Sequence, residues 1–329
     1  MERVLVTGGA GYIGSHVCKH LAEEGVEPVV FDNLSRGHRD AVKWGPLVVG
    51  DLSDSALLLE AMREHQPSAV IHFAALSYVG ESVINPDLYY TNNVSGTISL
   101  LNAMGKAKIR KLVLSSSCAV YGVPPALPIS EDAPTCPVNP YGRTKHIVET
   151  LLGDYAKAFG IAYAALRYYN ACGADASGHL GERHDPETHL IPRALMAAAG
   201  TLAHLDIFGT DYDTPDGTCI RDYIHVSDLA EGHVLALKYL GTDPETAVFN
   251  LGVGKGLSVY QVLSAIETVT GRKVPTRIEA RRIGDPPILF ADPTKAREVL
   301  GFVPSRSDIS NIIRTAWDFM RRTDDPPAV

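Results

Sequence analysis

Short apolar runs alternate with longer segments of helical periodicity along the first half of the chain. The runs are rich in β-branched residues, which favours buried strands, at residues 4–7, 28–31, 47–50, 69–75 and 111–114. Apolar residues at helical spacing predict helices between them, at about 12–24, 53–65 and 85–105. This alternation predicts an α/β fold, a Rossmann-like, doubly wound parallel sheet whose ligands bind at the carboxyl ends of the strands.

The second half begins with the same pattern and then loses it. A helix over 141–159 and a strand over 162–167 continue the alternation. Beyond them we expect helices at 190–199, 228–240, 258–270 and 307–322, and strands at 205–208, 221–226 and 247–251. The strand at 247–251 would return to the first sheet, so the domains are interleaved. Residues 1–168 with about 226–257 form one domain, and 169–225 with 258–329 form mainly a smaller α+β lobe.

Three glycines interrupt the first apolar run at intervals of three. Gly8 would allow a sharp turn, Gly11 the close approach of a pyrophosphate, and Gly14 the packing of helix against strand. The free N–H groups at the start of the helix would face the anion. A purely structural turn is the alternative interpretation.

Asp32 stands at the end of the second strand, 18 positions after Gly14. A carboxylate there accepts hydrogen bonds from an adenosine ribose and repels a 2′-phosphate, so it favours NAD over NADP. Arg36 nearby weakens this preference only a little. The alternative for Asp32 is a simple strand-end turn. His72 lies inside an apolar strand, where a hydrogen-bonded core histidine is the expected role.

A tyrosine and a lysine four residues apart open the helix over 141–159. Tyr141 and Lys145 share one helical face. A tyrosine is a poor base at neutral pH, and a neighbouring ammonium favours its phenolate. Ser117, at the end of the fifth strand, could orient the same substrate hydroxyl. An exposed helical pair is the alternative for the tyrosine and lysine.

Composition and charge narrow the class of protein. The chain has 329 residues, of which 45% are apolar and 21% charged, and its net charge is −8. This charge argues against a nucleic-acid surface. The five cysteines have no metal-binding spacing and are expected to be reduced thiols. That spacing also leads us to expect no metal. No apolar run is long enough to span a bilayer, so we expect no membrane partner and a cytoplasmic location.

Ordered motifs extend these features over nearly the whole chain. They are Gly11-Tyr12-Ile13-Gly14-Ser15-His16, Gly80-Glu81-Ser82-Val83, Asn92-Asn93-Val94, residues 115–122, Asn139-Pro140-Tyr141-Gly142, residues 166–170 and residues 216–226. With Ser117 and Tyr141-x-x-x-Lys145, they resemble the extended short-chain dehydrogenase/reductase family and, within it, the UDP-glucose 4-epimerase family. The resemblance implies bound NAD and interconversion of UDP-galactose and UDP-glucose through a transient 4-keto sugar.

The resemblance also implies roles for individual residues. Those expected to bind NAD are Gly8, Gly11, Tyr12, Ile13, Gly14, Asp32, Asn33, Leu34, Ser35, Arg36, Gly37, Asp51, Leu52, Phe73, Ala74, Ala75, Ser77, Asn92, Tyr141, Lys145 and Tyr169. Those expected to contact a UDP-hexose are Ser117, Tyr141, Asn170, His189, Leu190, Asp206, Ile207, Phe208, Arg221, Arg282, Asp285 and Leu289. Tyr141, Lys145 and Ser117 would be catalytic, and the two arginines would neutralise the diphosphate. A homodimer joined through helices 85–105 and 141–159 is also implied.

Two departures from the family pattern leave other activities open. Cys118-Ala119 stands where the family usually has Ala-Thr, and Leu289 stands where it has a tyrosine or a smaller residue. Leu289 leaves open whether an N-acetylated sugar such as UDP-N-acetylglucosamine is the substrate. UDP-xylose and UDP-glucuronate are also open, because these sugars differ only in the C5 substituent. A nucleotide-sugar 4,6-dehydratase would need an acid and base after Ser117, which Cys118 and Ala119 do not provide. A non-catalytic NAD-binding regulator would be expected to lack Tyr141 or Lys145.

Overall fold

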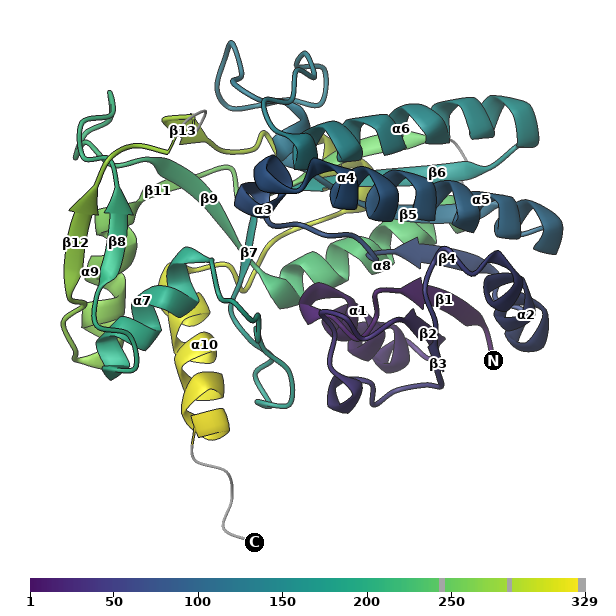
Figure 1. Ribbon diagram of the computed structural model, residues 1–329, viewed down its shortest axis with the longest axis horizontal. Helices are drawn as coiled ribbons and strands as arrows, with labels where there is room; N and C mark the ends of the chain where they lie inside the picture. The colour runs from purple at the N-terminus through teal and green to yellow at the C-terminus, as the bar shows by residue number, and fades with distance from the viewer. Residues whose placement is uncertain (243–245, 283–285, 325–329) are drawn as a thin grey trace, which may run out of the picture.

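A seven-stranded parallel sheet forms the central layer of the computed structural model, which describes residues 1–242, 246–282 and 286–324 (Figure 1). Its strands in spatial order are β10 (Ala247–Leu251), β6 (Ala162–Tyr168), β5 (Lys111–Ser117), β4 (Ala69–His72), β1 (Arg3–Thr7), β2 (Glu27–Asp32) and β3 (Leu47–Val49). The chain runs outward from β1 through β2 and β3, then crosses to β4 on the other side. The strand order therefore reverses between β1 and β4, which is where a doubly wound sheet binds its ligand.

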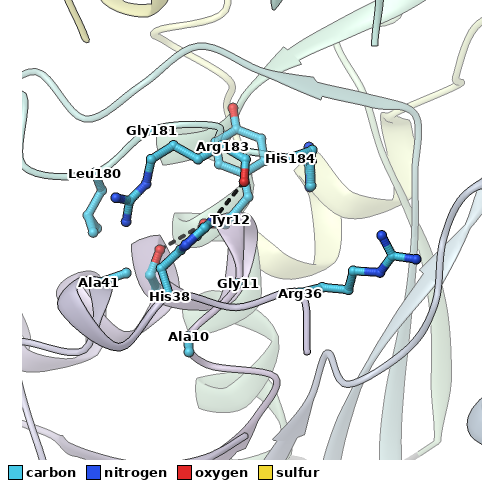
Figure 2. A pocket seen from close by; sticks show the side chains of 11 residues that line it. Ala10, Gly11, Tyr12, Arg36, His38, Ala41, Leu180, Gly181, Arg183 and His184 are labelled. Atoms are coloured by element: carbon cyan, nitrogen blue, oxygen red, sulfur yellow. Dashed lines mark hydrogen bonds between the residues drawn. The ribbon is translucent and has the colours of Figure 1, made fainter. Parts of the chain in front are cut away.

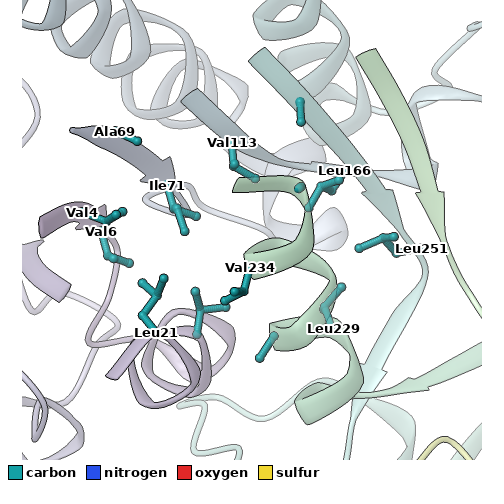
Figure 3. Packing of buried hydrophobic residues seen from close by; sticks show 14 of the residues in the cluster. Val4, Val6, Leu21, Ala69, Ile71, Val113, Leu166, Leu229, Val234 and Leu251 are labelled. Atoms are coloured by element: carbon teal, nitrogen blue, oxygen red, sulfur yellow. The ribbon is translucent and has the colours of Figure 1, made fainter. Parts of the chain in front are cut away.

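Helices cover both faces of this sheet. Helices α1 (Tyr12–Glu23) and α8 (Val226–Thr242) pack on one face, and α2 (Ser55–His65), α5 (Gly96–Ala107) and α6 (Pro140–Phe159) pack on the other. Successive side chains of a strand point to opposite faces, so Val4 and Val6 join the first core cluster and Leu5 joins the second. Figure 3 shows the first cluster, in which Leu21, Leu229 and Val234 face the strands.

The start of α6 is fixed by local sequence. The Asn139 side chain accepts a hydrogen bond from the backbone N–H of Gly142 at 2.8 Å, and Pro140 occupies the first turn. Both are strong helix-start signals. They place Tyr141 in the first turn, next to the carboxyl end of β5.

A second group of elements follows β7 (Asn170–Cys172), which continues from the carboxyl end of β6. It comprises α7 (Leu190–Ala199), β8 (Leu205–Phe208), β9 (Ile220–His225), β11 (Gly256–Ser258), α9 (Val259–Thr270), β12 (Thr276–Glu279), β13 (Ile288–Leu289) and α10 (Ile309–Asp324). Strand β9 pairs with β7, β11 and β13, while β8 pairs with β12. The three helices share a separate core cluster with β7, β8, β9 and β11, and all these elements lie together at one end of the sheet (Figure 1).

The elements differ from the sequence prediction in several places. The helix expected over 85–105 consists of α4 (Pro86–Tyr89), a π-helical segment at Tyr90–Ser95 and α5. Strand β4 ends at His72, because the N–H groups of Phe73 and Ala74 both donate to the Thr7 carbonyl. Helix α3 (Val79–Ile84) and the short strands β7, β11, β12 and β13 were not predicted.

Two expectations about single residue types are confirmed. His72 is buried, with Nδ1 2.7 Å from the Thr7 hydroxyl and Nε2 2.9 Å from the Thr97 hydroxyl. All five cysteines are free thiols. Among the described helices, none has the length and apolar character required to cross a lipid bilayer.

Candidate active site

The loop between β1 and α1 leaves space at only one of its three spaced glycines. Gly8 has a φ of +74°, and a Cβ there would lie 2.6 Å from the Ala74 backbone nitrogen. A Cβ on Gly14 would lie 2.3 Å from the Gly8 carbonyl oxygen. A Cβ on Gly11 would meet that oxygen at 3.3 Å and nothing else nearby. The backbone is therefore tightly packed at both ends and open in the middle, as a pyrophosphate cradle requires.

A small pocket opens beside this loop (Figure 2). Its walls are Ala10, Gly11, Tyr12 and Ser15 from the loop and α1, then Arg36, His38, Ala41, Leu180, Gly181, Arg183 and His184. The His38 backbone N–H donates to the Ala10 carbonyl at 2.9 Å, and His38 Nε2 lies 2.8 Å from the Arg183 carbonyl oxygen. The segment before α7 thus closes over the first turn of α1.

Asp32 lies against the same loop and is 7% exposed. Its two carboxylate oxygens accept hydrogen bonds from the backbone N–H groups of Ala10, at 3.0 Å, and Leu34, at 2.8 Å. Burial raises the pKa of Asp32. Each carboxylate oxygen has a second acceptor position, so the orientation fits a carboxylate that also receives ribose hydroxyls.

The other residues expected around the adenosine lie near Asp32 but are partly engaged with one another. The Asn33 side-chain amide donates to Asp51 at 2.7 Å, and Ser35 donates to Asn33. Arg36 pairs with Glu81 at 3.0 Å and lies over the Tyr78 ring. Gly37 packs against Ala10, and Leu52 is buried against Gly96.

The remaining predicted cofactor residues are spread along the carboxyl ends of the strands. Ile13 packs against the core, Phe73, Ala74 and Ala75 are half-buried after β4, Ser77 is exposed, and the Asn92 amide donates to Asn93 at 2.9 Å. Tyr169 is 7% exposed, and its hydroxyl makes no hydrogen bond with any described residue. A buried hydroxyl without a partner costs free energy, which indicates that a ligand group completes its environment.

Ser117 and Tyr141 come together at the junction of β5 and α6. Both are 8% exposed, and the Ser117 hydroxyl accepts the Ala119 N–H at 3.1 Å. Burial raises the pKa of Tyr141, and the neighbouring Tyr168 raises it further, while hydrogen bonding with Ser117 acts in the opposite direction. The protein by itself therefore keeps this phenol protonated, which differs from the expectation that Lys145 makes it more acidic.

The position of Lys145 explains why it does not make Tyr141 more acidic. Its Nζ donates to the Ser115 carbonyl at 2.7 Å, so the ammonium is held at the end of β5. Burial lowers the pKa of Lys145 to about 8, although Glu149 acts to raise it. Lys145 is thus mainly protonated at neutral pH but loses its proton well below the pH at which an ordinary lysine does, and shifted pKa values of this kind are common at catalytic sites.

Glu149 anchors a buried network below Lys145. Its carboxylate accepts hydrogen bonds from Nη2 and Nε of Arg167, at 2.6 and 3.0 Å, and from the Ser116 hydroxyl at 2.5 Å. Glu149 and Arg167 side chains are each 8% exposed. Sequence analysis missed this pair because no local motif links positions on α6 and β6.

The substrate side is built around β9. Arg221 donates to the Ile220 carbonyl at 2.8 Å and is the register partner of Leu289 in β13. Arg221 also acts on the pKa of Cys118, which burial raises to about 12 and Arg221 lowers. The Asn170 amide donates to the Asp222 carbonyl at 2.8 Å. The structure therefore brings Arg221, Leu289 and Asn170 together in the sheet around β9, and Arg221 is close enough to Cys118, at the end of β5, to act on it electrostatically.

A second predicted group is assembled on β8. The Arg282 guanidinium lies 4.0 Å from the centre of the Phe208 ring. Asp206 is paired with Arg277 at 2.9 Å, and Ile207 is buried in the core of the second group of elements. Phe208 and Arg282 are thus better placed than Asp206 or Ile207 to offer side chains to a ligand. Leu190 begins α7 after the half-exposed His189, and Asp285 lies outside the described residues.

Two further positioning residues have no signal in spacing alone. The Ser82 hydroxyl accepts the Tyr141 N–H at 3.2 Å. Asn93 bridges Leu76 and Thr144, with its amide 3.0 Å from the Thr144 hydroxyl. Both belong to short motifs that the sequence analysis recorded only as part of a resemblance.

Comparison with known proteins gives this arrangement a family. The model of the "NAD dependent epimerase/dehydratase family" matches residues 4–252. The chain belongs to the NAD-dependent epimerase/dehydratase family. It is 51% identical over 323 residues to a UDP-glucose 4-epimerase of Rhizobium leguminosarum bv. trifolii, covering 98% of both chains.

Solved structures of this family share the whole fold. The chain matches the UDP-glucose 4-epimerase of Brucella ovis in complex with NAD with a TM-score of 0.95 and 57% identity, covering 97% of this chain and 98% of that one. It matches an enzyme from Stenotrophomonas maltophila, solved with NAD and formylated UDP-arabinopyranose, with a TM-score of 0.95 and 43% identity over 98% and 99% of the chains. The glycine cradle, Asp32 and the unpartnered Tyr169 hydroxyl fit the NAD on which the epimerase/dehydratase family depends.

Proposed function

We propose that this protein is a 4-epimerase that interconverts UDP-galactose and UDP-glucose. The observation that carries the proposal is the buried pair of Ser117 and Tyr141 at the carboxyl end of the sheet, on the side where the glycine loop prepares a nucleotide site. The high identity to UDP-glucose 4-epimerases over the full chain supports it.

Tyr141 is proposed as the group that takes and returns the proton of the sugar's 4-hydroxyl. Ser117 shares a hydrogen bond with that hydroxyl and orients it, and Lys145 holds the nicotinamide ribose. NAD, when bound, accepts a hydride from C4 and gives it back, and its positive ring favours the Tyr141 phenolate. Removal of the O–H proton and the C4 hydride leaves a 4-keto sugar, and the reverse transfers to the opposite face give the epimer.

Turning the sugar requires strong anchoring of the nucleotide and weak contacts to the hexose. Arg221 and Arg282 are proposed to hold the diphosphate, and Phe208 the uracil, with Asn170, His189 and Leu190 as further contacts. The groups that adjoin Ser117 and Arg221 are Cys118, Ala119 and Leu289. They offer few directional hydrogen bonds, so the keto sugar could rotate about its link to the diphosphate.

We propose that the part of the chain built on the large sheet binds NAD and the part built on the smaller sheets binds the UDP-sugar. Residues 1–168 with 226–257 would bind NAD, and 169–225 with 258–329 would bind the UDP-sugar. The edge strand β10 joins the large sheet through β6, whereas Gly256–Ser258 pairs with β9 in the smaller one. The proposed boundary at residue 257 is therefore approximate by two residues, since Gly256 and Leu257 pair with the smaller sheet.

A homodimer and a cytoplasmic location are also proposed. The face of α3 and α4 carries exposed apolar side chains, namely Val79, Val83, Ile84 and Leu88, which are 45%, 63%, 78% and 44% exposed. An apolar patch of this kind is typical of an interface, and α3 and α4 both contact α6, one of the two helices proposed to join the protomers. Free thiols are usual in a reducing compartment, and cell fractionation would test the location.

The test uses purified protein and a panel of UDP-sugars, with product chromatography. We expect UDP-galactose and UDP-glucose to interconvert without added NAD. Replacement of Tyr141 with Phe should lower turnover by several orders of magnitude while the bound cofactor remains measurable by its absorbance. Near-normal epimerisation by Tyr141→Phe would remove the tyrosine from this role. Turnover confined to UDP-N-acetylglucosamine, UDP-xylose or UDP-glucuronate would reassign the substrate, a dehydrated product would indicate a 4,6-dehydratase, and no product would indicate a regulator.

A further inference from the structure

Two glutamates and two histidines meet in the segment between β7 and α7. Glu182, His184, Glu187 and His189 each place one potential ligand atom within 4.8 Å of the others. All four come from one short stretch with the spacing Glu-x-His-x-x-Glu-x-His. The proposed reaction uses only His189 among them, as a contact to the nucleotide-sugar.

The separations between these atoms fit the coordination shell of one ion. Glu182 Oε1 lies 2.7 Å from His189 Nδ1 and 3.1 Å from His184 Nδ1. The Glu187 oxygens lie 3.2 Å from His189 Nδ1 and 3.6 Å from His184 Nδ1. Ligand bonds of about 2.0–2.1 Å in a tetrahedral site place neighbouring ligand atoms roughly 3.3 Å apart. The four observed separations surround that value.

The burial of the two glutamates and the position of His184 Nδ1 also favour a bound cation. The Glu182 and Glu187 side chains are 7% and 10% exposed, so their charges need a positive charge nearby, which either protonated imidazoles or a bound cation can supply. His184 Nδ1 is buried and makes no hydrogen bond with a described residue, although a carboxylate oxygen lies 3.1 Å away. This nitrogen and this oxygen therefore lie in the same small volume as the other two potential ligand atoms.

Neighbouring groups hold the ligands in place. Glu187 Oε1 accepts the backbone N–H groups of Thr188, at 2.7 Å, and His189, at 2.8 Å. The His184 ring packs edge-on against Tyr12 and Tyr78, with ring centres 6.2 and 5.8 Å apart. Supporting contacts of this kind orient metal ligands in proteins.

We propose that Glu182, His184, Glu187 and His189 bind one divalent transition-metal ion, with Zn²⁺ as the ion that this donor set fits best. Two carboxylates and two neutral imidazoles neutralise the ion and fill a tetrahedral shell, so the site is structural rather than catalytic. Its effect is to fix the segment before α7 against Tyr12 at the start of α1. Arg183 and His184 of the same segment line the small pocket of Figure 2 beside the glycine loop.

Protons are the competing occupants of this cluster. Each imidazole lies within ion-pair distance of a glutamate, His184 at 3.1 Å and His189 at 2.7 Å from Glu182. A proton on either ring would pair with a carboxylate, so a metal ion has to displace such protons in order to bind. A cluster that serves only as an ion-pair network would bind no metal stoichiometrically.

The experiment uses the full-length, NAD-loaded protein after removal of metal with a chelator. Calorimetric titration with Zn²⁺ should give one site per chain, and Co²⁺ should produce the visible absorption of a four-coordinate ion. The variants Glu182→Gln and Glu187→Gln should bind Zn²⁺ at least about tenfold more weakly. Near-UV circular dichroism checks that each variant is folded.

The matched control is His20→Gln/Glu23→Gln. It removes a histidine–glutamate pair, 3.6 Å apart, that lies on α1 outside the cluster. This control should bind Zn²⁺ as the parent does. The proposal is overturned if the parent binds no stoichiometric Zn²⁺, or if the cluster variants and the control bind equally. Should a glutamine variant fail to fold, the stoichiometry and the Co²⁺ spectrum of the parent decide the question.

Discussion

The strongest test of the buried network is the substitution Glu149→Gln. Glu149 and Arg167 are each 8% exposed and form a bidentate pair, and the Ser116 hydroxyl donates to the same carboxylate. The amide keeps the shape of the side chain but leaves the guanidinium charge buried without a counter-ion. Breaking a buried pair in this way costs about 3–5 kcal/mol. At roughly 2 °C per kcal/mol for a chain of this size, we expect the melting temperature to fall by roughly 6–10 °C.

The same substitution should alter the pH dependence of turnover. Burial lowers the pKa of Lys145 to about 8, and the Glu149 charge keeps it from falling further. At pH 7 the ammonium then outnumbers the amine by about ten to one. Without the carboxylate the pKa falls, so the ammonium is lost at lower pH and the alkaline limb of the activity profile moves toward neutrality.

The assay is kcat for UDP-galactose against pH, together with thermal unfolding at pH 7. The double variant Glu149→Met/Arg167→Met is the control, because it removes both charges and should recover much of the lost stability. It should not restore the alkaline limb, since Lys145 still lacks its carboxylate. An unchanged limb in Glu149→Gln would refute the role assigned to Glu149, even if the protein were destabilised.

Two further predictions concern the cofactor loop and the exposed apolar face. A Cβ at Gly14 would lie 2.3 Å from the Gly8 carbonyl oxygen, so Gly14→Ala should displace the loop. We expect this variant to retain at least about tenfold less NAD after purification. Gly105 on α5 faces open space, so the control Gly105→Ala should retain NAD as the parent does. Equal NAD content in both variants, measured by absorbance after denaturation, would contradict this. The variant Val83→Lys/Ile84→Lys places two charges on residues that are 63% and 78% exposed. We expect it to convert the proposed dimer to a monomer, as measured by sedimentation. An unchanged mass would place any interface elsewhere.

The sequence predicts the central sheet well because its strands are marked by residue type. Val4, Val29 and Val113 belong to apolar runs bounded by glycine or polar residues, and each is fully buried. The same reasoning located the carboxyl ends of β1, β2 and β5, and with them the glycine loop, Asp32 and Ser117. Periodicity also placed Tyr141 and Lys145 on the first turns of α6.

Other features depend on contacts between distant residues and could not be read from local patterns. The strands β11 and β13 are two or three residues long and form only by pairing with β9. The contact of Lys145 with the Ser115 carbonyl, and the high pKa of Tyr141, follow from burial that the sequence does not reveal. The Glu-x-His-x-x-Glu-x-His spacing is present in the sequence, but only the folded segment shows that the four side chains converge.

The position of β10 has a consequence for synthesis of the chain. This strand lies at the edge of the large sheet and pairs with β6, from which it is separated along the chain by β7, α7, β8, β9 and α8. A nascent chain that has not yet released residues 247–251 from the ribosome leaves the hydrogen-bonding edge of β6 uncovered. Such an edge is open to pairing with foreign strands, so the completion of the nucleotide-binding half must wait until three-quarters of the protein has been translated.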